Sequence, residues 1–336
     1  MTDSDSPALP FTGERFTPEC VREIRYEHWH RYLFAWRIAE GKRVLDAACG
    51  EGYGSALLAR TATSVHGVDI DAASVAHARE RYVRENLRYE VADATQLDVA
   101  PASYDLIVSF ETLEHVEAQE RMLDGFAHAL ADDGVLVISS PDKRTYSEVA
   151  GFRNEFHTRE LYRDELLAML KPHFPHVRLY GQKLLFQSAI WAQDGTGGPC
   201  EAWTGAAAPG GAIVGNLDYA PLYFIAVCAR RELPRRLQAL SLYGDREESV
   251  YTHYNHEVRK NMTAGDRIAE LERELETLRG AAPQAAPGSI ESGSIESGSM
   301  EPDPTGSDPT GSDSTGSDPT APERRDWRFW RRKPDA

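Results

Sequence analysis

Short β-branched runs alternate with longer helical patterns from about residue 19 to residue 230. Apolar runs bounded by turn residues are typical of strands, whereas apolar positions three and four apart are typical of helices. The predicted strands are 43–47, 64–69, 87–91, 104–109, 134–139, 176–182 and 222–229. The predicted helices between them are 54–60, 72–85, 118–131 and 159–170. This alternation predicts an α/β domain with a mostly parallel sheet.

The α/β pattern defines the first of three zones, residues 1–232. An amphipathic helix near its start carries Tyr26, His30 and Arg31, and we expect it to form a lid over a binding site. Residues 183–221 separate the last two predicted strands. Because their centre is rich in Gly, Ala and Pro, they are predicted to form a flap or mobile insertion.

The second zone, residues 233–280, is charged and helical in pattern. Ile268, Leu271, Leu275 and Leu278 alternate spacings of three and four, which is typical of a coiled-coil seam. The pattern extends over only two heptads. A short coiled coil and an amphipathic helix docked on its own domain are therefore both open interpretations.

The third zone, residues 281–336, is of low complexity and is predicted to be disordered, because its composition buries too little apolar surface. Its end, residues 324–333, combines basic side chains with Trp327, Phe329 and Trp330. Basic and aromatic residues favour an anionic membrane surface. This segment has three possible interpretations: a peripheral membrane contact, a solubilising tail or a partner-docking peptide.

The composition excludes some classes of protein. Lys and Arg number 37 against 53 Asp and Glu, a formal charge of −16, which argues against a globally basic nucleic-acid binder. The four cysteines are widely spaced and form no CxxC pair, as expected in a reducing compartment. The N-terminus lacks signal-peptide features, and the longest apolar runs are shorter than the ~20 residues of a membrane helix. We expect a soluble, cytoplasmic protein.

The segment 44–54 carries the sharpest chemical signal, a strand that enters a glycine-rich turn and then a helix. Asp46 lies at the strand end, four residues before Gly50, and the spacing Gly50-x-Gly52-x-Gly54 differs from GxGxxG. A dinucleotide site needs this turn to accept a pyrophosphate, which a carboxylate would repel. A ligand with a cationic amine and a sulfonium, such as S-adenosylmethionine (SAM), would be attracted instead.

Two further carboxylates follow the next two predicted strands. Asp69 ends the second strand and could accept hydrogen bonds from both ribose hydroxyls. Asp93, in Ala92-Asp-Ala94, could accept from an adenine amino group, although a turn or helix cap explains it nearly as well. Asp71 is interpreted as the cap of the following helix.

On these motifs, residues 43–140 resemble class I SAM-dependent methyltransferases, of the methyltransferase type 11-like kind. The resemblance implies a Rossmann-like seven-stranded sheet of order 3-2-1-4-5-7-6 with an antiparallel last strand. It also implies that Asp46 and Gly50 hold the methionine part of SAM, Asp69 the ribose and Asp93 the adenine edge. The predicted cofactor-binding residues are Asp46, Ala47, Gly50, Gly52, Asp69, Ile70, Asp93, Ala94, Ser109 and Glu111.

Three looser motifs, at 12–15, 26–32 and 248–255, resemble methyltransferases associated with bacterial cell-surface polysaccharide synthesis. This resemblance implies O-methylation of a saccharide or lipid-linked glycan, and a C-terminal helix that could bind glycan-assembly proteins. A small-molecule or quinone-type methyltransferase and a non-catalytic SAM-binding scaffold are the alternatives. An NAD-dependent dehydrogenase is disfavoured by Asp46.

Candidate catalytic residues follow the fourth and fifth strands. His115 suits proton abstraction near neutral pH, or it only orients its loop. His157 could face the acceptor, or it closes a turn before a helix that Thr158 caps. Arg31 could pair with the methionine carboxylate or an acceptor phosphate, or it is a solvated helix residue.

A metal site is a less favoured alternative. On a helix, Glu111, Glu114 and His115 would share one face, and with His157 they could bind a divalent ion. Some small-RNA and quinone-precursor methyltransferases share this Glu-x-x-Glu-His pattern, and this resemblance suggests the metal site.

Overall fold

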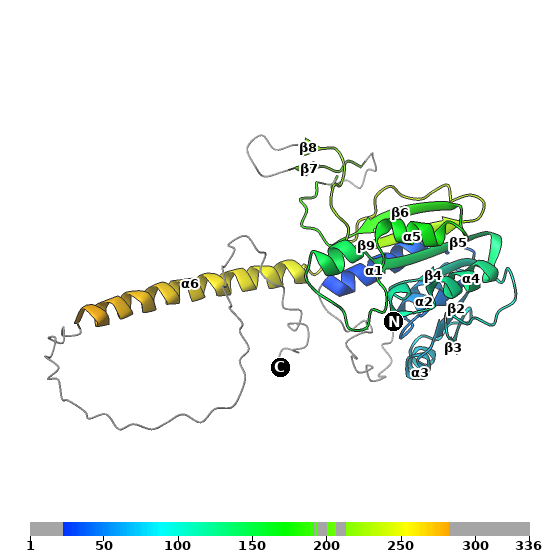
Figure 1. Ribbon diagram of the computed structural model, residues 1–336, viewed down its shortest axis with the longest axis horizontal. Coiled ribbons are helices and arrows are strands. Elements are labelled where there is room, and N and C mark those ends of the chain that lie inside the picture. Colours follow the sequence, from blue (N-terminus) through cyan, green and yellow to red (C-terminus); the bar gives the residue numbers. More distant parts are fainter. Residues whose placement is uncertain (1–22, 191, 194–199, 206–212, 282–336) are drawn as a thin grey trace, which may run out of the picture. The chain divides into compact units, whose positions relative to one another are not determined.

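The computed structural model describes residues 23–190, 192–193, 200–205 and 213–281 (Figure 1). They belong to two compact units, one up to Val250 and one from Tyr251 onward, whereas the sequence predicted a division between 232 and 233. The predicted tail, including 324–333, lies outside the described residues, as does the centre of the 183–221 insertion. No helix in the described part of the chain has the length and apolar character needed to cross a bilayer.

The first unit contains the seven-stranded sheet. Its strands are β1 (Arg43–Ala47), β2 (Ser64–Asp69), β3 (Leu87–Val91), β4 (Tyr104–Ser109), β5 (Leu130–Pro141), β6 (His176–Gln182) and β9 (Tyr223–Ala229). They lie in the order β3-β2-β1-β4-β5-β9-β6, and β9 is antiparallel to both of its neighbours. The predicted Rossmann-like methyltransferase fold is confirmed, with β9 as the seventh strand of the predicted order.

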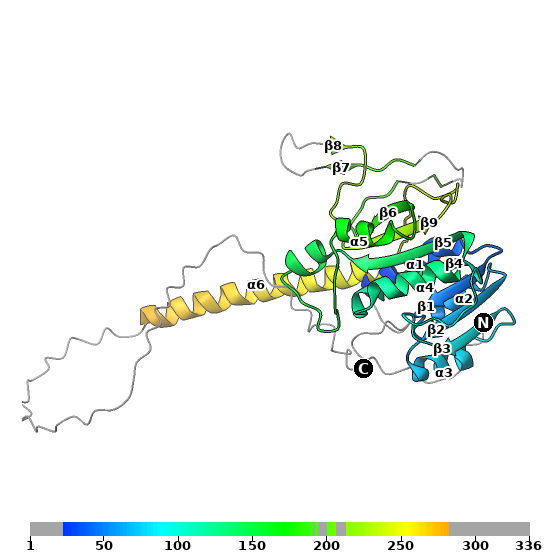
Figure 2. The same cartoon turned by 45° about the vertical axis from the view of Figure 1, so that its right-hand side comes forward.

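Helices cover both faces of this sheet (Figures 1 and 2). They are α1 (Glu23–Trp36), α2 (Tyr53–Leu58), α3 (Ala72–Arg81), α4 (Gln119–Ala129) and α5 (Arg163–Leu170). Alternate residues of the central strands enter two different cores: Leu106 and Val108 of β4 join the core of α1 and α2, and Ile107 joins that of α4 and α5. Burial on both faces is why these strands read as continuous apolar runs.

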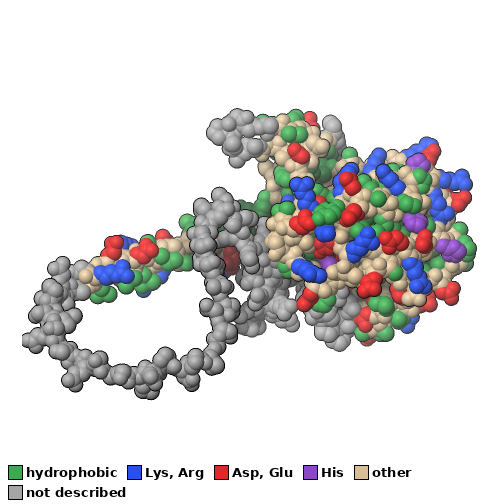
Figure 3. Space-filling view, in the orientation of Figure 1, with side chains coloured by type: hydrophobic (Ala, Val, Ile, Leu, Met, Phe, Trp, Pro, Cys, Tyr) green, Lys and Arg blue, Asp and Glu red, His purple; other side chains and the backbone are tan. Residues whose placement is uncertain are grey.

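The remaining elements are short or lie outside the sheet. They are the 3-10 helix η1 (Leu113–His115), the π-helical turn η2 (Arg144–Glu148), the hairpin strands β7 (Thr204–Gly205) and β8 (Ile213–Val214), and α6 (Ser249–Ala281). The hairpin falls within the predicted insertion. In the space-filling view, acidic and basic side chains are mixed on the visible face of the first unit (Figure 3).

Three element boundaries differ from the sequence prediction by four residues. Helix α3 ends at Arg81 rather than 85, and strand β5 begins at Leu130, inside the predicted helix 118–131. Leu130 pairs with Tyr104 of β4, so tertiary pairing overrides its helical pattern. Helix α5 begins at Arg163 rather than 159, and Thr158 is not its cap. The Thr158 hydroxyl instead donates to the His115 carbonyl at 3.1 Å.

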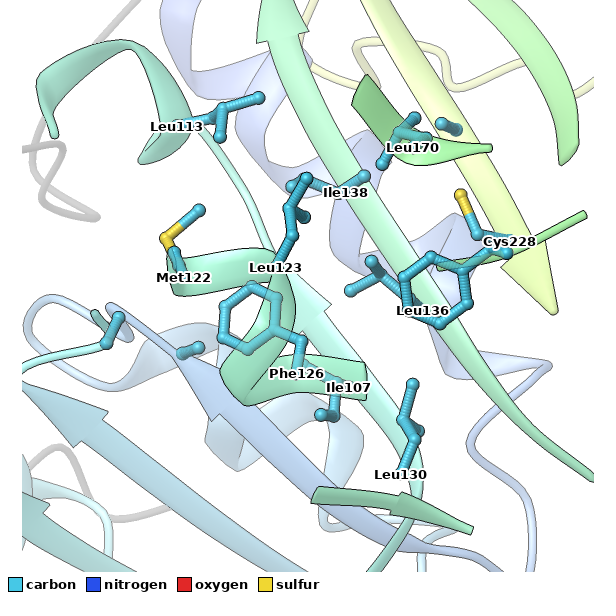
Figure 4. Close-up of a cluster of buried hydrophobic side chains, with 14 of the residues drawn as sticks. Ile107, Leu113, Met122, Leu123, Phe126, Leu130, Leu136, Ile138, Leu170 and Cys228 are labelled. Carbon is cyan, nitrogen blue, oxygen red and sulfur yellow. The ribbon is translucent and has the colours of Figure 1, made fainter. Parts of the chain in front are cut away.

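The core beneath α4 carries much of the packing in the first unit. Met122, Leu123 and Phe126 of α4 are fully buried against the sheet, where Figure 4 shows Phe126 beside Ile107. Interiors of this kind are packed as densely as organic crystals, so a deleted side chain leaves a cavity.

Substituting Phe126 by Ala is therefore expected to lower the free energy of unfolding by about 3–5 kcal/mol, because it removes a buried ring. Phe186, which is 70% exposed, supplies the matched control, and Phe186→Ala should change it by less than about 0.5 kcal/mol. Urea denaturation followed by circular dichroism measures both. Equal losses for the two variants would contradict this account of the core.

Candidate functional site

The site lies where the parallel strands end, and its first element is Asp46 at the end of β1. The Asp46 carboxylate is fully buried and accepts hydrogen bonds from the Ser55 hydroxyl at 2.6 Å and the Tyr32 hydroxyl at 3.1 Å. Burial raises the pKa of Asp46 to about 7, and those two hydrogen bonds oppose the rise. Near neutral pH this carboxyl therefore changes charge readily.

The loop after Asp46 turns sharply, and two of its positions have no room for a side chain. Gly52 has φ +93°, and a Cβ there would lie 2.7 Å from the Cβ of Ala78. A Cβ on Gly54 would lie 2.0 Å from the ring of Tyr32, the same ring whose hydroxyl contacts Asp46. These glycines let the loop and α1 pack together around the carboxylate.

Glu51, inside the same loop, fastens it to α3. Its buried carboxylate accepts from the Tyr82 hydroxyl at 2.7 Å and lies 3.0 Å from His77 Nε2 and 3.5 Å from Arg81. These partners come from α3 and its C-cap residue Tyr82, so this helix holds the turn after β1.

Asp69, at the end of β2, also holds the glycine loop. One of its carboxylate oxygens accepts from the Gly50 N–H at 2.8 Å, and the other accepts from the Asp71 N–H at 2.9 Å. Asp71 caps α3 by accepting from the Ala73 and Ser74 N–H groups, which confirms its predicted role. Each Asp69 oxygen keeps a lone pair that could serve ribose hydroxyls.

The other predicted cofactor residues lie around this loop. Asp93 accepts hydrogen bonds from Thr95 and Gln96, so in this structure it forms the turn that was its alternative reading. Ala47 and Ala94 are buried, and Ile70 is exposed beside Asp69. An apolar side chain in that place suits the flat face of an adenine. Binding of SAM by these residues stays a prediction.

Glu111 follows β4 and adopts φ +50°, a strained conformation for a residue with a Cβ. Its main-chain N–H donates to the Ser139 hydroxyl at 3.0 Å, and that hydroxyl donates to the Glu111 carboxylate at 2.7 Å. This reciprocal pair joins the ends of β4 and β5. Ser109, the last residue of β4, is fully buried.

Arg31 lies opposite Glu111 and is buried, so the solvated-helix reading is wrong. Its Nε donates to Gln182 Oε1 at 2.8 Å, its Nη2 lies 3.5 Å from the Glu111 carboxylate, and its guanidinium lies over the Tyr223 ring. Among the described residues, neither Nη1 nor Nη2 has a hydrogen-bond acceptor. The carboxylate of Glu111 compensates the buried charge.

His115 ends the short helix η1. Its Nδ1 lies 3.0 Å from the carbonyl oxygen of Phe156, and a carbonyl can only accept, so Nδ1 carries a proton. In the neutral ring the lone pair is then on Nε2, which lies 3.9 Å from the Glu114 carboxylate. A histidine that acts as a general base through Nε2 requires this tautomer.

The loop with His157 is fastened to the same turn. The Thr158 and Arg159 N–H groups donate to the Glu114 carbonyl at 2.7 and 3.1 Å. His157 Nδ1 lies 2.6 Å from the Glu160 carboxylate, and its Nε2 lies 3.0 Å from the Asn154 amide nitrogen. Both ring nitrogens of His157 therefore contact protein groups.

The metal alternative is only partly reproduced. Ligand atoms of Glu114, His115 and His157 lie within 4.8 Å of one another, but Glu111 is not among them. Glu111 is held by Ser139 and Arg31, and the chain between Glu111 and His115 forms a bend and η1 instead of an α-helix. A metal here would compete with Asn154 and Glu160 for His157.

Glu114 has no hydrogen-bond partner for either carboxylate oxygen within the described ranges, although the side chain is buried. Burial and then the charge of Glu111 raise the pKa of Glu114 well above its ordinary value. Two aromatic rings adjoin this region: Tyr146 stacks on His157 at 5.3 Å, and Tyr223 lies 5.7 Å from Tyr146.

Sequence reasoning did not assign Tyr32, Ser139, Tyr146 and Tyr223 to the site. Tyr32 falls inside the 26–32 motif, which could have pointed to it. Ser139 lies near the carboxyl end of a predicted strand, a usual place for site residues. No sequence motif around Tyr146 or Tyr223 marks them as site residues. They come together only through the sheet register and the position of η2.

A mostly parallel sheet of this order, with an acidic glycine-rich loop after β1, defines the class I methyltransferase architecture. Residues 21–189, half of the chain, match the family described as "Methyltransferase domain", and the chain belongs to that family. Its methyl donor is accordingly SAM.

Relatives agree with this membership. A probable SAM-dependent methyltransferase of Mycolicibacterium smegmatis is 39% identical over 178 residues, which cover 51% of this chain and 68% of that protein. One from Mycobacterium tuberculosis is 39% identical over 170 residues, 49% of this chain and 61% of its own length. A ubiquinone biosynthesis O-methyltransferase of Agrobacterium fabrum is 37% identical over 109 residues, 30% of this chain and 43% of that protein.

Among solved structures, a SAM-dependent methyltransferase of Thermotoga maritima, titled a possible histamine N-methyltransferase, is similar. Its TM-score is 0.45 at 15% identity, and the match covers 62% of this chain and 90% of that one.

The pKa of Asp46 yields a test of its predicted contact with the methyl donor. If the ionised carboxylate attracts the cationic ligand, affinity for SAM should fall as pH drops through 7, to about one tenth at pH 6 relative to pH 8. Titration calorimetry at several pH values measures this. The control is Asp46→Asn, which should bind SAM more weakly and with a smaller pH response. Identical pH profiles for the two proteins would refute the role of Asp46.

Proposed function

We propose that this protein transfers the methyl group of SAM to a hydroxyl group, with His115 as the general base. The donor sulfonium is already activated, so the protein needs to align the acceptor, exclude water and remove a proton. The observation that carries the proposal is the hydrogen bond of 3.0 Å between His115 Nδ1 and the Phe156 carbonyl, which leaves the lone pair on Nε2. In the proposed step, Nε2 takes the hydroxyl proton as the acceptor oxygen bonds to the methyl carbon. The bond between that carbon and the sulfonium sulfur breaks at the same time, its electron pair stays on sulfur, and S-adenosylhomocysteine is the leaving group.

For the acceptor, we propose a saccharide or a lipid-linked glycan. Sugars present many hydroxyl groups, and the carboxyl groups of Glu114 and Glu160 adjoin His115 and His157. Glu114 in particular is buried without a donor in the described part of the chain. The likeness of the 26–32 motif to polysaccharide-associated methyltransferases adds support, because Arg31 and Tyr32 adjoin the site.

A second candidate acceptor is a phenol of the quinone-precursor type. The similarity to ubiquinone biosynthesis O-methyltransferases favours it, and the rings of Tyr146 and Tyr223 suit a flat aromatic acceptor. Both acceptors lose a hydroxyl proton, so the base is the same for either.

Labelled SAM separates the two acceptors. The full-length protein is incubated separately with cell-envelope glycans and with a catechol. The methyl label should enter the glycans, since the carboxyl groups around the histidines suit a polyhydroxyl acceptor. Chromatography after acid hydrolysis then locates the label on a sugar oxygen. Label in the catechol alone would replace the saccharide proposal by the quinone-type one.

The base assignment has its own test. His115→Ala should leave the dissociation constant for SAM within about threefold while kcat falls about 10²–10⁴-fold, because only proton removal is lost. The exposed His256 supplies the control, and His256→Ala should leave kcat unchanged. Steady-state kinetics with calorimetry measures both. Full turnover in His115→Ala would exclude the base role.

A further inference from the structure

Helix α6 presents apolar side chains to solvent along one face. Ile268, Leu271, Leu275 and Leu278 are 57%, 42%, 51% and 67% exposed. Side chains three and four residues apart lie on the same face of a helix, so these four form one continuous stripe. The visible surface of α6 mixes hydrophobic side chains with acidic and basic ones (Figure 3). Such a stripe in water indicates a surface that another helix covers.

The spacing fixes the heptad positions of this stripe. Only an a-to-d step has three residues, so Ile268 and Leu275 are a positions and Leu271 and Leu278 are d positions. The same register extends backward within α6. The seam, as we define it, consists of Asn261, Ala264, Ile268, Leu271, Leu275 and Leu278.

The charges beside the seam match those of a second copy. Arg267 and Glu274 occupy g positions, and Glu272 and Arg279 occupy e positions. In a parallel pair, each g side chain faces the e side chain five residues later on the partner helix. Arg267 therefore meets the second copy's Glu272, and Glu274 meets its Arg279. Both contacts are attractive, and symmetry doubles them.

We propose that α6 is a homodimerisation helix, in which two copies of this chain pair through the seam as a parallel two-stranded coiled coil. Asn261 argues for the parallel, in-register orientation. A lone Asn at an a position pairs with its counterpart only when the two copies align in register, and it selects dimers at some cost in stability. In an antiparallel pair centred on 268–278, Asn261 would lie beyond the partner's seam. The short seam predicts a concentration-dependent association.

Two charge-reversed variants test the proposal without removing the seam. Arg267→Glu with Arg279→Glu gives a protein in which all cross-helix pairs repel, and Glu272→Arg with Glu274→Arg does the same with opposite sign. Each variant alone should dimerise at least about tenfold more weakly than the unaltered full-length chain. An equimolar mixture should recover the affinity, because every pair becomes attractive. Sedimentation velocity over roughly 1–100 µM measures the three samples.

Controls separate this outcome from misfolding and from other partners. Circular dichroism and SAM binding should be unchanged in both variants, because the substitutions lie on the exposed surface of α6. If the unaltered chain is monomeric across the whole concentration range, the proposal is overturned. The apolar stripe of α6 would then have to pack on the protein's own first unit or on another protein. A mixture that stays monomeric would overturn it as well. Neither result bears on the methyltransferase activity, which is assayed separately.

A cysteine cross-link tests the orientation. In a background with Cys20 and Cys200 replaced by Ser, Asn261→Cys should form a covalent dimer on mild oxidation, since a parallel pair faces the two residues across one layer. Thr263→Cys, at a c position away from the seam, is the matched control and should stay monomeric on a non-reducing gel. Equal cross-linking of both variants would refute the parallel register.

Discussion

The buried carboxylate of Asp46 is the constraint on which the site depends. It lies fully inside the first unit, where an unpaired charge is costly, and it is held by the hydroxyls of Tyr32 and Ser55. These donors come from α1 and α2, on the same face of the sheet. Asp46 lies one residue before the end of β1, and Asp69, the last residue of β2, accepts from the Gly50 N–H of the loop that follows β1. The pKa of about 7 records how finely burial and hydrogen bonding are balanced there.

A second network fixes the groups around His115. The carbonyl oxygens of Glu114 and His115 accept hydrogen bonds from residues 158–159. In the same loop, the carbonyl oxygen of Phe156 accepts from the His115 ring. The side chain of Gln119 adds two donations, to the carbonyls of Leu113 and Arg159. Ring orientation and tautomer are thus set by main-chain atoms. Such positioning is what proton transfer requires, since small displacements of a base reduce its efficiency.

The sequence predicted the parts of the site that are local in the chain. Asp46, Asp69 and the glycine loop are recognisable because strand ends and turns are encoded within a few residues. The Thr158 cap failed since its hydroxyl had a better partner 43 residues earlier, in His115. The interpretation of Arg31 as a solvated helix residue failed for the same kind of reason: its burial depends on Gln182 and Tyr223, whose approach follows from the sheet order. No pattern within one segment contains that information.

Helix α1 links two parts of the candidate site through neighbouring residues. Tyr32 donates to Asp46, whereas Arg31 extends toward Glu111 and Tyr223. Successive helical residues diverge by about 100°, so one helix reaches both regions without bending. The same helix packs Tyr32 and Phe34 into the core with α2. Any movement of α1 that admitted a ligand would therefore uncover the Asp46 carboxylate and separate Arg31 from Glu111 together. Each of the two regions therefore contributes to holding α1 in place.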